Sequence, residues 1–174
     1  MLGAINVVGG ILVIGSYVQG LKAHPALRDG LWGHVPLRIR PFYGVSGLLA
    51  AAGYLAFTYF VMFSLEPDEA EIANTFSFKL FLIIYALILF PSALWMPLTF
   101  AMLENPSRGL WREIRITLAV VGLASLGMLA ALLGLNTREP AFIYWLAVAG
   151  TVAFCIQTAL LDALVWPAFF PVKR

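Results

Sequence analysis

The sequence predicts an all-α integral membrane protein, a single bundle of five transmembrane helices, and two observations carry this prediction. The first is composition: 61% of the residues are hydrophobic and only 11% are charged, whereas a soluble domain carries about 25% charged residues. So few charged side chains do not cover the surface of a domain in water. The second is the presence of five long apolar segments, since about 20 apolar residues cross the hydrocarbon core of a bilayer.

Each apolar segment is expected to be helical, because a segment in lipid must satisfy its backbone hydrogen bonds internally. The first four segments contain no charged residue, and the fifth contains only Asp162. The predicted helices cover residues 2–21, 42–65, 80–103, 116–135 and 141–166, so that residues 1–174 form one transmembrane domain. No Lys or Arg precedes the first segment, which has the length of a full span, and we expect a retained helix rather than a cleaved signal peptide.

The basic residues fall unequally on the two sides of the predicted bundle. Nine lie in connections of one side: Lys22, Arg28, Arg38, Arg40, Arg108, Arg112, Arg115, Lys173 and Arg174. Only Lys79 and Arg138 lie on the other side. Because Lys and Arg accumulate in cytoplasmic loops, we predict that the N-terminus is outside and the C-terminus is cytoplasmic.

Two connections carry further expectations. The connection 22–41 contains Pro25, Gly30, Trp32, Gly33, Pro36 and Pro41, and this composition predicts a lid-like loop over the cytoplasmic mouth of the bundle. The acidic stretch after Ser64 has the pattern of a helix start, with Ser64 or Glu66 as the cap and Pro67 in the first turn.

The third predicted helix contains Pro91 and Pro97. Each proline removes a backbone donor and frees the carbonyl four residues earlier, and the hydroxyls of Ser92 and Thr99 are nearby candidates to satisfy these carbonyls. Tyr85, Ser92 and Trp95 recur at about helical spacing and are expected to share one face. Such a face serves either as an aromatic wall with a polar handle for a ligand, or as packing surface within the bundle.

Asp162 is the only ionisable residue inside a predicted span, close to the arginine-rich side. An acid within the membrane is a functional hypothesis, and two alternatives are open for Asp162. It forms an ion pair with Arg115 or Arg112, or it serves a ligand or a proton. Glycine-rich faces in the first, second and fourth helices predict close helix packing or a dimer contact.

The sequence shows no catalytic constellation, and we expect no enzyme. No histidine lies in a predicted helix, and Cys155 is the only cysteine, so that neither haem nor a multi-cysteine metal site is predicted. His24, Asp29 and His34 have poor helical spacing for a metal site. A net charge of +2 does not indicate a nucleic-acid partner.

A motif in the third helix resembles the translocator protein family (TspO/MBR, the tryptophan-rich sensory proteins). That family carries Trp-x-Pro-Leu/Ile-x-Phe with a tyrosine ten residues before the tryptophan, and the matching residues here are Tyr85, Trp95, Pro97, Leu98 and Phe100. Residues 49–54 are similar to a second segment of the family. The resemblance implies a five-helix bundle that binds tetrapyrroles or sterols in a cavity near the first loop and that often dimerises.

By this resemblance we expect a membrane-embedded binding protein for a porphyrin or a sterol-like lipid. The expected ligand-binding residues are Tyr54, Tyr85, Ser92, Trp95, Pro97, Phe100, Tyr144 and, from the lid, Trp32. The expected partners are the lipid bilayer, the hydrophobic small molecule and a second copy or other membrane subunits. Two alternatives are a structural accessory subunit of a larger membrane complex and, third, a small transporter or channel.

Overall fold

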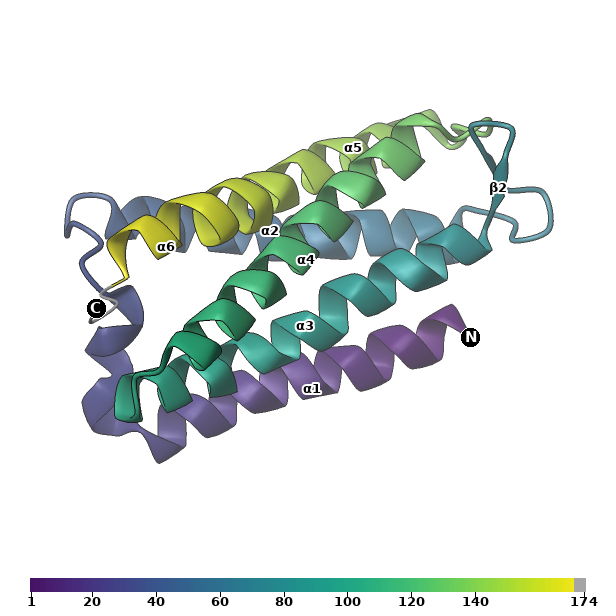
Figure 1. The fold of residues 1–174 in the computed structure, drawn as a ribbon. Helices are drawn as coiled ribbons and strands as arrows, with labels where there is room; N and C mark the ends of the chain where they lie inside the picture. The colour runs from purple at the N-terminus through teal and green to yellow at the C-terminus, as the bar shows by residue number, and fades with distance from the viewer. Residues whose placement is uncertain (171–174) are drawn as a thin grey trace.

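The computed structural model describes residues 1–170 and is an α-helical bundle with five helices long and apolar enough to cross a membrane (Figure 1). The prediction of an all-α bundle of five membrane-spanning helices is therefore confirmed. The first four spans are α1 (Leu2–Ala23), α2 (Arg40–Phe63), α3 (Lys79–Glu104) and α4 (Arg108–Leu133). The fifth span runs continuously through α5 (Ala141–Cys155), the π-helix η2 (Ile156–Val165) and α6 (Trp166–Phe169). Lys173 and Arg174, which contribute to the predicted charge asymmetry, lie outside the described residues.

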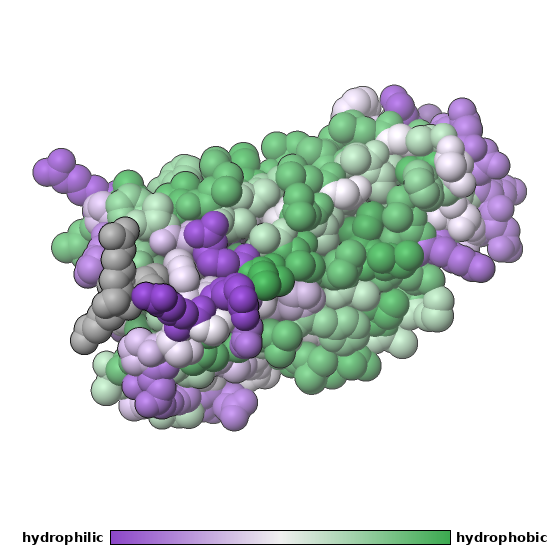
Figure 2. Space-filling model, in the orientation of Figure 1, coloured by the Kyte–Doolittle hydropathy of each residue, from purple (hydrophilic) through white to green (hydrophobic). Residues whose placement is uncertain are grey.

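Most of the contacts between the spans lie in four helix pairs. α1 packs on α3, α3 on α4, α4 on the fifth span, and the fifth span on α2. α1 thus lies at an edge of the bundle, and its buried residues are only Leu2, Gly9 and Gly20. Figure 2 shows hydrophobic side chains over the middle of the visible face and hydrophilic ones towards both ends, as expected for a protein surrounded by lipid.

α4 begins earlier than predicted, at Arg108 rather than at residue 116. The Ser107 side chain accepts a hydrogen bond from the backbone N–H of Leu110 at 3.1 Å and caps the helix. The basic residues up to Arg115, which the prediction placed in a loop, therefore lie on the first turns of α4. The absence of charged residues marks the apolar part of a helix, but it does not mark the charged turns by which the helix extends beyond that part.

The acidic stretch after Ser64 does not start a helix, and this prediction is wrong. α2 ends at Phe63, and the chain forms a hairpin of β1 (Glu71–Ile72) and β2 (Phe76–Ser77). Its turn passes through Ala73 and Asn74, both at φ 53°, a left-handed conformation that a helix does not contain.

The hairpin is held on the end of α4 by contacts distant in sequence. Ile72 forms a bridge with Leu135, and the backbone N–H of Ala73 donates to the carbonyl of Gly134 at 2.7 Å. Ile72 is only 3% exposed. Burial of this one apolar side chain in an acidic segment therefore favours the hairpin over a solvated helix.

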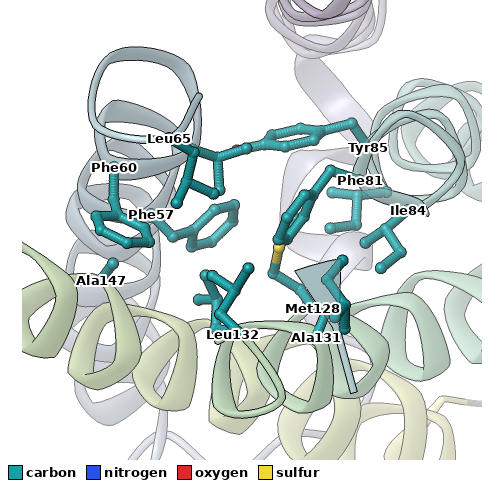
Figure 3. Packing of buried hydrophobic residues seen from close by; sticks show 14 of the residues in the cluster. Phe57, Phe60, Leu65, Phe81, Ile84, Tyr85, Met128, Ala131, Leu132 and Ala147 are labelled. Carbon is teal, nitrogen blue, oxygen red and sulfur yellow. The ribbon is translucent and has the colours of Figure 1, made fainter. Parts of the chain in front are cut away.

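Two hydrophobic clusters occupy opposite halves of the bundle. The cluster in the half near the hairpin, drawn in Figure 3, packs Phe57, Phe60, Phe81, Met128 and Leu132 between α2, α3 and α4. The second cluster, in the other half, contains the buried residues Val35, Tyr43, Met102, Ile114, Leu118, Leu161, Trp166 and Phe170. Three residues of the candidate site described below belong to this second cluster or pack against it: Tyr43, Trp95 and Trp166.

The connection 22–41 contains the short helix η1 (Pro25–Trp32) and lies across the second half of the bundle (Figure 1). The backbone N–H of His34 donates to the Phe169 carbonyl at 2.7 Å, and the Trp166 indole Nε1 donates to the Leu31 carbonyl at 2.8 Å. η1 is therefore hydrogen-bonded to the end of the fifth span.

The hydroxyls next to the prolines of α3 do not satisfy the carbonyls that the prolines free. Ser92 Oγ donates to the Ile88 carbonyl at 2.6 Å, and Thr99 Oγ1 donates to the Trp95 carbonyl at 2.7 Å. Each hydroxyl bonds the carbonyl four residues before itself, because that carbonyl is the nearest on its own face of the helix.

Candidate functional site

The eight residues predicted to bind a ligand are divided between different regions of the bundle. Tyr85 is fully buried in the cluster of Figure 3 and donates to Thr58 Oγ1 at 3.0 Å. Tyr54 packs on it edge to face, with 6.1 Å between ring centroids, and donates a hydrogen bond to Asn6 Oδ1. These two tyrosines therefore have protein partners for their hydroxyls and join α1, α2 and α3.

Two further predicted residues are also part of the packing. Tyr144 is fully buried, packs on Phe60 with centroids 5.5 Å apart, and donates to the Leu132 carbonyl at 3.2 Å. Phe100 is 1% exposed and stacks on His24 with centroids 4.5 Å apart. Tyr144 thus belongs to the half of the bundle near the hairpin, and Phe100 to the other half.

The remaining predicted residues differ in their surroundings. Pro97 is exposed, and Ser92 is bonded to its own helix. Trp32 packs edge to face on Tyr43, with centroids 6.1 Å apart, under the guanidinium of Arg40. Trp95 packs on the second cluster. Two shallow apolar depressions of about 250 and 150 Å³ beside the fifth span are lined by none of the eight residues.

The expected ion pair between Asp162 and Arg115 is not formed in the described structure. Arg115 is on the exposed face of α4, whereas its neighbour Ile114 is the residue that points into the second cluster. Asp162 Oδ1 instead accepts a hydrogen bond from Gln157 Nε2 at 2.8 Å.

The π-helix η2 explains this pairing. In an α-helix, residues five apart point about 140° away from each other. In a π-helix the repeat is i to i+5, so residues five apart lie one above the other. η2 covers both Gln157 and Asp162 and thereby brings their side chains together. π-helical turns are rare and are often found at functional sites.

Side chains from four elements are linked to the segment that contains Asp162. The hydroxyl of Tyr43 donates to the carbonyl of Leu161, the residue before Asp162, at 3.2 Å. Trp95 joins the Tyr17 ring, at a centroid distance of 5.7 Å, to the Trp166 ring at 5.9 Å. We define the Asp162 cluster as Tyr17 of α1, Tyr43 of α2, Trp95 of α3, and Gln157, Asp162 and Trp166 of the fifth span.

Two buried polar atoms of the Asp162 cluster have no hydrogen-bond partner. They are the donor Trp95 Nε1 and the acceptor Gln157 Oε1, and no other buried side-chain nitrogen or oxygen within residues 1–170 lacks a partner. The neighbouring indole of Trp166, in contrast, is bonded to the Leu31 carbonyl. Buried polar groups are almost always paired in folded proteins, so a partner from outside the chain is the natural complement to these atoms.

Asp162 and Trp95 were singled out separately from the sequence, and neither Tyr17 nor Gln157 was among the expected ligand-binding residues. Gln157 and Asp162 are five residues apart, a spacing that places them together only in a π-helix. The rings of Tyr17 in α1 and Trp95 in α3 are in contact although the two residues are far apart in the sequence. A polar residue five positions before the only intramembrane acid was the one available signal.

Comparison with known proteins gives no relative from which a site can be transferred. No protein-family model, curated protein or solved structure matches the chain. The resemblance to the translocator protein family stays a prediction based on the motif in α3. The proposals that follow depend on the geometry of this chain.

Proposed function

We propose that the protein binds an apolar small molecule within the membrane, at the Asp162 cluster. The observation that carries this proposal is the pair of buried, unpartnered atoms, Trp95 Nε1 and Gln157 Oε1. One is a donor and the other an acceptor. Gln157 bonds Asp162 directly, and Trp95 packs on Trp166 of the same span. A bound molecule with one polar region complements the Trp95 N–H, the Gln157 oxygen and the Asp162 carboxyl group.

The energetics favour an external partner. A buried donor or acceptor without a hydrogen bond costs about 1–3 kcal/mol. Lipid chains offer no hydrogen bonds, so the two atoms are not satisfied by the hydrocarbon around the bundle. A ligand that supplies an acceptor to Trp95 and a donor to Gln157 recovers this free energy.

The position of the cluster supports entry from lipid. Tyr17 is 37% exposed on α1, and Trp95, Gln157 and Asp162 are each partly exposed although the two unpartnered atoms are covered. Aromatic rings with a few polar anchors are typical of sites for apolar ligands. The Asp162 cluster thus combines partly exposed side chains with buried polar atoms.

A tetrapyrrole or a sterol is the ligand class that the translocator resemblance proposes. Of the motif residues in α3, Trp95 is the one that belongs to the Asp162 cluster, whereas Tyr85 and Phe100 are packed in the protein. Trp95 therefore links the motif to the proposed site.

The proposal is tested by purifying the protein in lipid nanodiscs and identifying co-purified small molecules by native mass spectrometry. Trp95→Phe removes the unpartnered N–H while keeping an aromatic ring. Trp145→Phe is the matched control, because Trp145 is 56% exposed on the outer surface of α5. We expect a retained molecule in the wild type and the control and its loss in Trp95→Phe. Equal retention in both variants, or a wild-type protein that carries no small molecule, contradicts the proposal.

A second candidate function is that of an accessory subunit, and the surface of α1 is the observation that favours it. α1 lies at an edge of the bundle, where a Cβ atom on Gly10 or Gly15 would meet nothing within 4 Å. Small residues on an outer face allow another transmembrane helix to approach closely. Co-purification of a stoichiometric partner chain, lost in a Gly10→Leu/Gly15→Leu double variant, would establish this role. A second copy of this chain in that position would instead establish a homodimer.

A further inference from the structure

We propose that the molecule bound at the Asp162 cluster is a lipophilic cation, an apolar body that carries one positively charged ammonium or phosphonium group. This inference rests on the proposed binding of an apolar small molecule and names a cationic ligand in place of the tetrapyrrole or sterol that the motif resemblance implies. It follows from the Asp162 carboxylate, which has no basic partner among the described residues, and from the aromatic rings of the Asp162 cluster.

Asp162 has no basic partner in the part of the chain that the structure describes. Its contact is the neutral amide of Gln157, and the one ion contact within residues 1–170 joins His24 to Glu104. A charged side chain inside a membrane is costly unless it is paired. A cationic ligand supplies the missing counter-charge, which a neutral sterol does not, and an anionic porphyrin adds a second negative charge.

Two arginines in the same half of the bundle, Arg40 and Arg115, form no ion pair with Asp162. The Nε of Arg40 donates to the Val35 carbonyl at 3.2 Å, and its guanidinium lies 5.3 Å from the centre of the Trp32 ring. Arg115 is exposed on α4. Arg40 and Trp32 thus form a cation–π contact at this end of the bundle.

The rings of the Asp162 cluster are suited to a cation with an apolar body. Tyr17, Trp95 and Trp166 form a row with centroids 5.7 and 5.9 Å apart. Aromatic faces attract cations, and the attraction grows when water is excluded. The Gln157 Oε1 atom adds an acceptor for the N–H of a protonated amine, and the Trp95 N–H is left for an acceptor atom on the same ligand.

The test compares two probes of similar shape, the cation tetraphenylphosphonium and the neutral triphenylphosphine oxide, by equilibrium binding to the protein in nanodiscs. Protein-free nanodiscs correct for partition into lipid. Asp162→Asn removes the charge but keeps a side chain that can bond Gln157, and Asp162→Glu keeps the charge. Glu113→Gln is the matched control, because Glu113 is an exposed acid on α4.

We expect the wild type, Asp162→Glu and Glu113→Gln to prefer the cation, and Asp162→Asn to lose about tenfold or more of its affinity for the cation relative to the neutral probe. The ratio of the two affinities is compared within each protein, so a fraction of unfolded molecules does not change it. Equal affinities of the wild type for both probes overturn the inference, even where Asp162→Asn does not fold.

The outcomes also separate this inference from the proposed function. If both probes bind equally and Trp95→Phe weakens both, the site binds apolar molecules but does not select a cation. If neither probe binds saturably and no small molecule co-purifies, both proposals fail.

Discussion

The backbone of Gly53 in α2 lies directly against the backbone of Gly150 in α5. A Cβ atom on Gly150 would lie 2.7 Å from Gly53 Cα and 3.0 Å from the Gly53 carbonyl oxygen. Such distances leave no room for a methyl group. Close approach at paired small residues is how helices pack in lipid, where burial of apolar side chains provides little drive for association.

Gly150→Ala is therefore expected to lower the free energy of unfolding by about 1–3 kcal/mol, because the α2–α5 contact must separate. Gly47→Ala in α2 is the matched control, since a Cβ there meets nothing within 4 Å. Reversible unfolding in mixed detergent micelles measures both variants. Equal stabilities of the two variants would show that the close contact does not limit packing.

A hydrogen bond between two side chains joins α4 to the fifth span. Thr158 Oγ1 lies 2.8 Å from Ser125 Oγ, and both residues are buried. We expect Thr158→Val to reduce the free energy of unfolding by about 1 kcal/mol, a typical value for a hydrogen bond between membrane helices. Thr151→Val is the control, because the Thr151 hydroxyl bonds only the Ala147 carbonyl of its own helix. A loss in Thr151→Val as large as that in Thr158→Val would argue against a specific contribution of the interhelical bond.

The hairpin is expected to be a stable cap on the bundle rather than a loose loop. Ile72→Ala removes a side chain that is 3% exposed and is expected to cost about 2 kcal/mol or more. Phe76→Ala removes a larger side chain that is 53% exposed and is expected to cost much less. The two variants are compared by the rate of protease cleavage at the hairpin and by the free energy of unfolding. Faster cleavage in Phe76→Ala than in Ile72→Ala is the contrary result.

The orientation in the membrane is a prediction from the basic residues. They collect at the end of the bundle that contains η1, and the hairpin lies at the other end with the N-terminus (Figure 1). In a Cys155→Ser background, a single cysteine introduced as Asn74→Cys is expected to react with an impermeant maleimide added outside intact cells. A cysteine introduced as Arg38→Cys is expected to react only after permeabilisation. The reverse pattern would place the N-terminus in the cytoplasm.

The extent of sequence-based prediction follows from what lipid imposes. The five spans are readable because each apolar segment must satisfy its own backbone in lipid. The hairpin could not be predicted from the sequence, because it depends on the pairing of Ile72 with Leu135, which is distant in the sequence. The hydrogen bond between Gln157 and Asp162 was not predicted, since a π-helix changes which residues share a face. Trp95 was singled out for its motif, but its neighbours Tyr17 and Trp166 come from other helices.

The central claim, that the Asp162 cluster holds a ligand, is tested most directly by the indole N–H resonances of the ¹⁵N-labelled protein in nanodiscs during titration with tetraphenylphosphonium. Trp95 Nε1 has no partner in the protein, whereas Trp145 lies on the outer surface of α5 away from the cluster. The account predicts that the Trp95 resonance moves and saturates while that of Trp145 stays in place. A Trp95 resonance that stays unchanged with tetraphenylphosphonium and also with the neutral triphenylphosphine oxide would contradict it.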